Sequence, residues 1–222
     1  MRAMWKWCCL ALILAHLLSG PAQAGTVTGT VTVKPIAKSK VPPRYYLGPY
    51  RSARGKAAAD SAVFGEVVVS LQGEMLNQKS RPPARPLKMA QHGQQFIPSV
   101  LPVLVGSTVE FPNEDNFYHN VFSVAGGERF DLGRFGTGGT ASQTFIKPAL
   151  VVVHCEIHTD MKAFIVVLGN PYFTLPDAAG HFAIHEVPAG TYTLKAWHPT
   201  QGEQSVQVVV PASGTISVNL SL

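Results

Sequence analysis

The stretch that decides both fold and chemistry is His154-Cys155-Glu156-Ile157-His158-Thr159-Asp160-Met161. Within it Cys155, His158 and Met161 have Cys-x2-His-x2-Met spacing, and His119 stands 36 residues before the cysteine. Two imidazoles, one thiolate and one thioether are the donor set of a mononuclear electron-transfer copper site. The soft sulfur donors favour Cu(I) and imidazoles accept both oxidation states, so this pattern predicts a redox-active copper site.

The first 24 residues have the composition of a secretory signal peptide. Arg2 and Lys6 precede a mostly apolar run from Cys8 to Leu18, and Ala22-Gln23-Ala24 supplies the small residues of a cleavage site. The apolar run is well short of the ~20 residues that a membrane helix needs. We therefore expect cleavage after Ala24, a periplasmic or secreted protein, and no stable membrane span once the signal is removed.

Cleavage would leave 198 residues and a single cysteine, Cys155, because Cys8 and Cys9 lie in the signal. A lone cysteine in an exported protein is a buried passive thiol, half of an intermolecular disulfide, or a metal ligand. The offsets of His158 and Met161 favour the ligand.

Charge is unevenly distributed along the chain. Removal of Arg2 and Lys6 leaves 16 Lys+Arg against 13 Asp+Glu, and residues 34–88 hold 11 of these bases with only three acids. Such a basic segment would suit docking to an acidic surface or anionic polymer, and a solvated basic loop explains it equally well. The bases are scattered among Pro and Ala in an exported chain, so we expect no nucleic-acid partner.

The remaining sequence favours an all-β protein. Short β-branched runs alternate with Gly, Pro and Asn, and no segment has a convincing helical period. Residues 34–62 and 72–86 are polar and proline-rich, which predicts a long insertion and a linker, and 126–139 is expected to form a glycine-rich loop. The expected strands are 26–33, 63–71, around Phe96, 101–105, 108–111, 120–124, 142–146, 150–155, 163–168, 172–175, 182–185, 192–197, 205–210 and 215–220.

Residues 96–168 resemble the cupredoxins of the plastocyanin and amicyanin type. The matching segments are Phe96-x-Pro98, Val105-Gly106-Ser107-Thr108-Val109-Glu110-Phe111, Asn113-Glu114-Asp115, His119-Asn120-Val121, Phe130-Asp131, Ser142-x-Thr144-Phe145, Cys155-x2-His158-x2-Met161 and Ala163-Phe164-Ile165-Val166. The resemblance implies a Greek-key sandwich. One histidine would lie at the end of an inner strand, and the other three ligands would share one loop.

In this chain the resemblance makes His119, Cys155, His158 and Met161 the ligands of one type 1 copper ion, with Met161 as the weak axial ligand. It also implies that Asn120 ties the two ligand loops together and presents its backbone amide to the sulfur. Such outer hydrogen bonds hold ligands in place and tune the potential.

The electron is expected to leave through the solvent edge of His158, framed by Phe117, Met161 and Ala163. Strand alternation places His154 on the face opposite Cys155, so we expect it not to bind metal.

The other polar residues have ordinary explanations. His181, His185 and His198 are expected at the surface, and His92, in a loop before Gly93, is expected at the surface or as an extra metal contact. Asn113-Glu114-Asp115 is too weak a pattern for calcium. The chain contains no Ser-His-Asp pattern, HExxH motif or phosphate loop. We therefore expect an electron-transfer protein and not an enzyme.

The C-terminal part resembles a different β-sandwich, the carboxypeptidase-regulatory or transthyretin-like family. The matching stretch runs from Phe173 to His198, and residues 25–33 and 63–71 look like the opening strands of the same family. We infer a sandwich split in sequence with the cupredoxin inserted into it. The alternative is a cupredoxin with extra N-terminal strands and a small C-terminal appendage.

The expected division is a signal peptide at 1–24, N-terminal strands with the basic insertion at 25–86, a cupredoxin at 87–170 and a transthyretin-like sandwich at 171–222. This arrangement resembles exported bacterial proteins described as plastocyanin-like or as methylamine utilisation proteins.

Three functions fit these observations. The first is an exported type 1 copper protein that carries single electrons between redox protein partners. The second is an envelope- or polysaccharide-binding scaffold with structural copper or none, and the third is periplasmic copper storage or delivery. The sequence leaves the partners, the pathway, the redox potential and the oligomeric state open.

Overall fold

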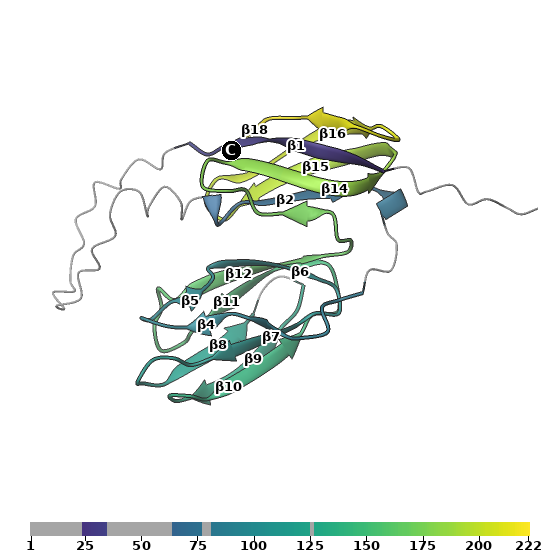
Figure 1. The fold of residues 1–222 in the computed structure, drawn as a ribbon. Helices are drawn as coiled ribbons and strands as arrows, with labels where there is room; N and C mark the ends of the chain where they lie inside the picture. The colour runs from purple at the N-terminus through teal and green to yellow at the C-terminus, as the bar shows by residue number, and fades with distance from the viewer. Residues whose placement is uncertain (1–23, 35–63, 77–80, 125–126) are drawn as a thin grey trace, which may run out of the picture.

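A computed structural model describes residues 24–34, 64–76, 81–124 and 127–222. The elements in these ranges are strands, apart from the 3-10 helix η1 (Glu74–Leu76), so the predicted all-β class is confirmed (Figure 1). Within the same ranges no helix has the length and apolar character to cross a bilayer. The predicted signal peptide, except Ala24, and the predicted basic insertion, except Lys34, lie outside the described residues.

The middle of the chain forms one β-sandwich, which we call the central sandwich. A five-stranded sheet has the order β6-β12-β11-β8-β9, and a three-stranded sheet has the order β10-β7-β3, while β4 pairs with β5. The strands are β3 (Leu87–Lys88), β4 (Ala90–Gln91), β5 (Phe96–Ile97), β6 (Val100–Leu104), β7 (Thr108–Pro112), β8 (His119–Ser123), β9 (Phe130–Phe135), β10 (Thr140–Thr144), β11 (Ala149–His154) and β12 (Lys162–Leu168).

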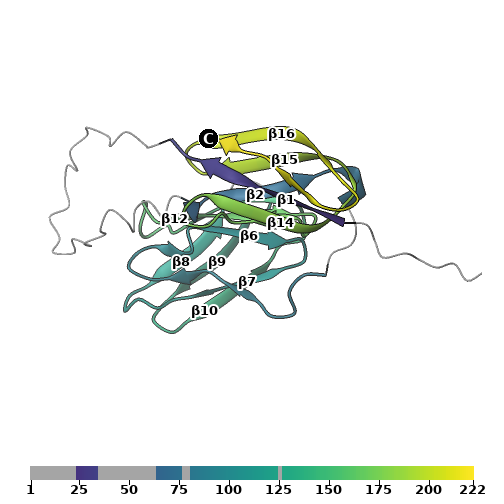
Figure 2. The same cartoon turned by 45° about the horizontal axis from the view of Figure 1, so that its top comes forward.

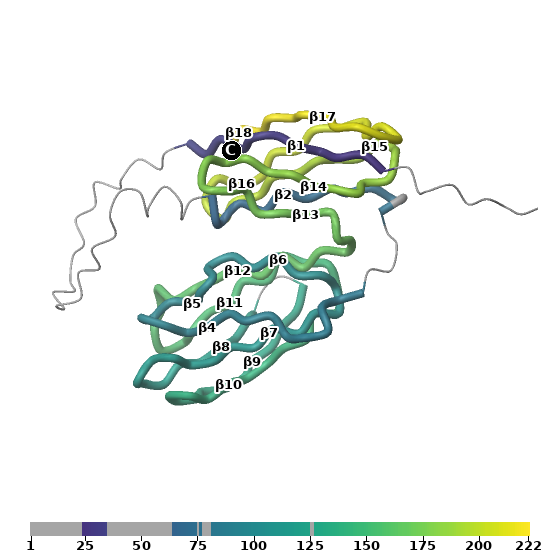
Figure 3. The backbone as a smooth tube through the Cα atoms, viewed as in Figure 1, coloured from purple at the N-terminus to yellow at the C-terminus, as the bar shows by residue number. Residues whose placement is uncertain are grey.

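A second sandwich takes strands from both sides of the first in sequence, and we call it the split sandwich (Figures 1 and 2). Its strands are β1 (Ala24–Thr32), β2 (Val68–Gln72), β13 (Phe173–Thr174), β14 (His181–Pro188), β15 (Gly190–His198), β16 (Gly202–Val210), β17 (Thr215–Ser217) and β18 (Leu220–Ser221). One sheet has the order β14-β1-β17, with β18 also on β1, and the other has the order β13-β2-β15-β16. The backbone trace in Figure 3 therefore leaves this sandwich after β2 and returns to it at β13.

Each sandwich has its own apolar core. In the central sandwich, alternate residues of β11 and β12 point inward, and their side chains are fully buried because period-2 alternation places them on one face. These residues are Val151, Val153, Ala163, Ile165 and Val167. The core of the split sandwich includes Val69 and Leu71 of β2 and Leu194 of β15. Each larger aliphatic side chain buried in this way contributes about 1.5–3 kcal/mol.

Strands β9 and β2 differ from the sequence-based expectations. The segment predicted as a glycine-rich loop at 126–139 contains strand β9, which pairs with β8. Gly133 has a φ of 74° in β9, and the pairing register shifts between Asn120 and Phe122. This irregularity hides the alternation that would have predicted a strand. The strand expected at 63–71 begins only at Val68.

Candidate metal centre

A short loop between two paired strands carries three of the four expected ligands. Strands β11 and β12 form an antiparallel pair that ends at His154 and Lys162. The loop between them is closed by a hydrogen bond from the Cys155 N–H to the Met161 carbonyl at 3.2 Å. Because the hairpin holds both ends, Cys155 and Met161 are fixed in the apolar core, each at most 3% exposed.

The side chains of His119, Cys155 and His158 converge. Cys155 Sγ lies 3.9 Å from His119 Nδ1 and 3.7 Å from His158 Nδ1, and the two Nδ1 atoms are 3.1 Å apart. His119 begins β8 and is fully buried, whereas His158 is half-buried. Two imidazole nitrogens and a thiol sulfur therefore face one point from two different segments. Met161, the expected axial ligand, is buried in the same apolar cluster as Cys155.

Asp115, which belongs to the Asn113-Glu114-Asp115 segment of the cupredoxin resemblance, holds His119. Asp115 Oδ2 lies 2.8 Å from His119 Nε2, and the carboxylate also accepts the N–H groups of Gly93 at 2.7 Å and Gln94 at 3.0 Å. Burial raises the pKa of Asp115, but the hydrogen bonds from Gln94, His119 and Gly93 outweigh it and the net pKa is lowered. An ionised carboxylate accepts the Nε2 proton, which leaves Nδ1 of His119 as a free lone pair facing the cluster.

His158 is also held in its ligand form. Burial lowers its pKa, the nearby His119 lowers it further, and Asp115 opposes both effects. Neutral imidazole is the form that binds metal. The lowered pKa therefore favours the form of His158 that can offer Nδ1 to a metal ion.

Asn120 fulfils only part of its expected role. Its backbone N–H points to Cys155 Sγ at 3.4 Å, as the cupredoxin resemblance implies. Its side chain instead donates to Asp131 Oδ1 at 2.8 Å and to the Gly133 carbonyl at 3.1 Å, both in β9. Asn120 therefore ties the cluster to β9, the edge strand of the sheet. The sequence did not predict this contact, because it did not predict a strand at β9.

The rim of the cluster also differs from expectation. Met161 and Ala163 were expected to frame a solvent edge, but they are 2% and 0% exposed because they point into the core. Phe117 packs against both imidazoles, with ring centroids 5.1 Å from His119 and 5.6 Å from His158. Tyr118 is 63% exposed and Ile157 41% exposed, so they supply exposed apolar surface on the segments that carry the two histidines.

The other histidines in the part of the chain that the structure describes lie outside the cluster. His154 packs against Phe122, with ring centroids 5.7 Å apart, and is not among the converging donors. His181 and His185 are exposed, as expected. His198, also expected at the surface, is 1% exposed. Its Nδ1 accepts the N–H groups of Thr200 and Gln201 within the turn after β15, and its Nε2 lies 3.6 Å from Glu66 Oε2.

The converging donors fit a metal ion. Nitrogen and sulfur donors lie about 2.0–2.3 Å from a borderline ion such as zinc, so two donors about 120° apart around one ion are separated by roughly 3.5–4 Å. The observed separations of 3.1, 3.7 and 3.9 Å are within a few tenths of an ångström of that range. Two imidazole lone pairs aimed at each other repel unless a proton or cation lies between them. The cluster therefore has the arrangement of a metal site, and a His2Cys set with a thioether nearby favours copper.

Comparison with known proteins gives matches only among solved structures. No family model and no curated relative matches the chain. A copper-containing nitrite reductase from Thermus scotoductus is 34% identical over 44% of this chain and 27% of its own length, with a TM-score of 0.37. A purple cupredoxin from Nitrosopumilus maritimus is 20% identical over 37% of this chain and 99% of its own, with a TM-score of 0.35. An oxidised amicyanin variant is 25% identical over 41% of this chain and all of its own, with a TM-score of 0.36. This chain thus spans about a quarter of the nitrite reductase.

Proposed function

We propose that the protein is an exported type 1 copper protein that carries single electrons between redox protein partners. The observation that supports this most directly is the convergence of His119 Nδ1, Cys155 Sγ and His158 Nδ1, all within 4.8 Å of one another, in a nearly closed apolar core. Bound copper would supply a one-electron couple between Cu(I) and Cu(II).

The ligands would be His119, Cys155 and His158, with Met161 as the fourth. Asp115 keeps the Nε2 proton of His119 away from the cluster, so the ring binds without first losing a proton there. The backbone N–H of Asn120 stabilises negative charge on the sulfur of Cys155.

Rigidity is the second requirement of an electron carrier, and the packing supplies it. The cysteine loop is anchored by paired strands at both ends, and His119 is fixed by Asp115 on its outer side. Ligands that cannot move accommodate both oxidation states with little rearrangement. Half-buried His158, beside Phe117 and exposed Ile157, is the shortest way from the cluster to a partner at the surface.

The first test is a titration of residues 25–222 with Cu(II), followed by visible absorption. We expect an intense band near ~600 nm, or shifted toward ~450 nm, that saturates at one equivalent and is absent in Cys155→Ser. His158→Ala should weaken or shift the band, whereas His154→Ala should preserve it because His154 faces away from the donors. A folded protein without such a band would overturn the proposal.

The same sample separates the other two functions. A storage or delivery protein would hold colourless Cu(I) tightly and exchange electrons slowly with a soluble redox partner. A scaffold would fold and bind its partner equally well with Cys155→Ser. Fast and reversible oxidation of a coloured form at an electrode is the outcome expected of the carrier.

A further inference from the structure

Strands β11 and β12 are apolar on both faces. Their inward residues fill the core of the central sandwich. Apart from His154 and Lys162 at one end of the pair, their outward residues are also apolar: Leu150, Val152, Phe164, Val166 and Leu168. A sheet with two apolar faces is covered on both sides. Exposure of this outer face to water would be unfavourable, so another layer should cover it.

The split sandwich supplies the cover. Val69, Leu71, Leu194 and Ala196 point into its own core, so alternation turns the intervening residues of β2 and β15 the other way. Among the described residues, contacts that join the sandwiches include the rings of Trp197 and Phe164 at 5.5 Å, the Asn170 side chain and the Leu71 carbonyl at 3.0 Å, and Ser99 Oγ and Glu66 Oε1 at 2.7 Å.

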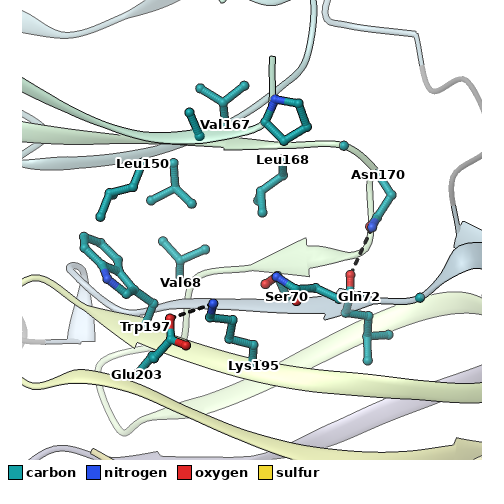
Figure 4. Close-up of a pocket in the computed structure, with 16 residues that line it drawn as sticks. Val68, Ser70, Gln72, Leu150, Val167, Leu168, Asn170, Lys195, Trp197 and Glu203 are labelled. Carbon is teal, nitrogen blue, oxygen red and sulfur yellow. Dashed lines mark hydrogen bonds and ion pairs between the residues drawn. The ribbon is translucent and has the colours of Figure 1, made fainter. Parts of the chain in front are cut away.

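The cover is incomplete between these contacts. A cavity of about 390 Å³ remains between the two sheets, with Leu150 and Leu168 on one side and Val68 and Trp197 on the other (Figure 4). Water occupies about 30 Å³ per molecule in the liquid, so this space would hold roughly a dozen waters against apolar walls. Its volume, mainly apolar lining and position between domains are those of small-molecule sites.

The few polar groups in this interdomain slot limit the ligand. Lys195 Nζ lies 2.6 Å from Glu203 Oε2, so the two lining charges cancel. Asn170 is already used, because its amide donates to Leu71 and its Oδ1 accepts the N–H of Tyr172. An ammonium has three protons, so Lys195 can donate to an acceptor while paired with Glu203. The slot thus suits an uncharged molecule that offers an acceptor oxygen.

We propose that the interdomain slot binds a neutral, planar, largely apolar molecule with a carbonyl oxygen that accepts from Lys195. Two facing sheets favour a flat shape, and Trp197 offers an indole for stacking. None of His119, Cys155 and His158 lines the slot. The inference is therefore independent of copper and goes beyond electron transfer.

The test is calorimetric titration of copper-free residues 25–222 with 2-methyl-1,4-naphthoquinone. We expect one saturable site with a dissociation constant on the order of 10–100 µM, the range for a ligand of this size. Trp197 is the only tryptophan in this part of the chain, so saturable quenching of its emission with the same constant would place the ligand in the slot. The absence of saturable binding would overturn the proposal.

Two variants test whether the ligand binds in the slot. Leu150→Arg, which places a long charged side chain on a residue that lines the slot, should weaken binding at least about tenfold, because that side chain takes up ligand space and its charge is costly to desolvate beside an apolar ligand. Ile146→Arg, on an exposed residue outside the lining, should bind like the wild type. Equal binding by both variants would contradict a site in the slot. Circular dichroism would confirm that both fold.

The polar requirement has its own test. The double variant Lys195→Met with Glu203→Met removes the donor without adding another and keeps the slot neutral, and should weaken quinone binding by about threefold to tenfold. Naphthalene-1-sulfonate, an anion of similar size, should bind more weakly than the quinone because Glu203 already neutralises Lys195. Tighter binding of the anion, or no effect of the double variant, would contradict a neutral carbonyl ligand.

Discussion

His119 Nε2 lies 2.8 Å from Asp115 Oδ2, while the other nitrogen of the same ring faces Cys155 and His158. Asp115 also accepts two backbone N–H groups from the turn between β4 and β5, at Gly93 and Gln94. A single nearly buried carboxylate thus connects a distant turn to the candidate metal centre. It fixes both the orientation of the His119 ring and the nitrogen that is free to bind.

Replacement of Asp115 by Asn should weaken copper binding. The amide removes the negative charge that favours a proton on Nε2, so Nδ1 is no longer reserved for metal. We expect a loss of about 10–100-fold in affinity, the usual effect of removing an outer partner of a ligand histidine. Competition with a chelator of known affinity would measure it.

Asp160→Asn is the matched control for this prediction. Asp160 lies in the same loop as Cys155 and His158 but is exposed, and the substitution removes the same charge. Its affinity should equal that of the wild type. If Asp115→Asn also kept wild-type affinity, the carboxylate would have no role in orienting the ligand.

The all-β class and the grouping of Cys155, His158 and Met161 in one loop could be predicted because both depend on local sequence. The alternation in β11 and β12 defines the paired strands, and the short spacing from Cys155 to Met161 leaves the connecting loop little freedom. His119 required the cupredoxin resemblance, because nothing local indicates that β8 lies beside β11. The signal peptide, Met161 as a ligand and the transthyretin-like family stay predictions.

Features that depend on long-range contacts were missed. The role of Asp115 depends on a turn some 20 residues earlier, and burial of His198 depends on a turn and on Glu66, which lies 3.6 Å away. Neither contact has a periodic signature in the sequence. The only sequence feature that pointed to the Asp115–His119 contact was their spacing of four residues, and outside a helix that spacing does not bring two side chains together.

Asp131 should influence the redox potential through Asn120. Its carboxylate accepts from the Asn120 side chain at 2.8 Å, and the Asn120 backbone N–H faces Cys155 Sγ. Asp131→Ala should loosen this N–H, and a thiolate that loses hydrogen bonding disfavours the electron-rich reduced state. A hydrogen bond contributes ~1 kcal/mol, which corresponds to ~40 mV for one electron.

Loss of negative charge near copper raises the potential by itself, so Asp131→Ala needs a reference with the same charge change. Glu156→Ala provides this reference, because Glu156 adjoins Cys155 and forms its ion pair with Arg134, not a hydrogen bond with Asn120. Voltammetry should give Asp131→Ala a potential some tens of millivolts below that of Glu156→Ala. Equal potentials would show that Asp131 acts only through its charge.

Buried His198 should make stability depend on pH. Burial lowers its pKa, and Glu66 opposes this only in part. The folded pKa is thus below the ordinary value of about 6.5, and between the two values the unfolded chain binds a proton that the folded chain does not. Stability from this residue is complete above about pH 6.5 and falls as the pH drops through the lowered pKa.

Urea unfolding at pH 7.5 and 5.5 would measure the effect of His198. The wild type should lose more stability on acidification than His198→Gln, whose amide oxygen can still accept the N–H groups of Thr200 and Gln201. The pKa of His158 is also lowered, but it contributes equally to both proteins and cancels in the difference. The same loss in both would exclude His198 as the titrating group.

Gly180 should tolerate alanine less well than Gly214, although both are left-handed, with φ of 85° and 90°. A Cβ at Gly214 would meet no atom within 4 Å, so Gly214→Ala should cost only the backbone strain, about 1–2 kcal/mol. A Cβ at Gly180 would fall against the Val31 carbonyl and 2.9 Å from Phe64 Cε1. The Gly180 carbonyl accepts the Val31 N–H at 2.8 Å, so neither backbone can withdraw without loss of that bond. The free energy of unfolding of Gly180→Ala, measured by equilibrium urea unfolding, should therefore fall by a further ~1–3 kcal/mol. Equal losses in the two variants would mean that β1 moves away from the added methyl group without cost.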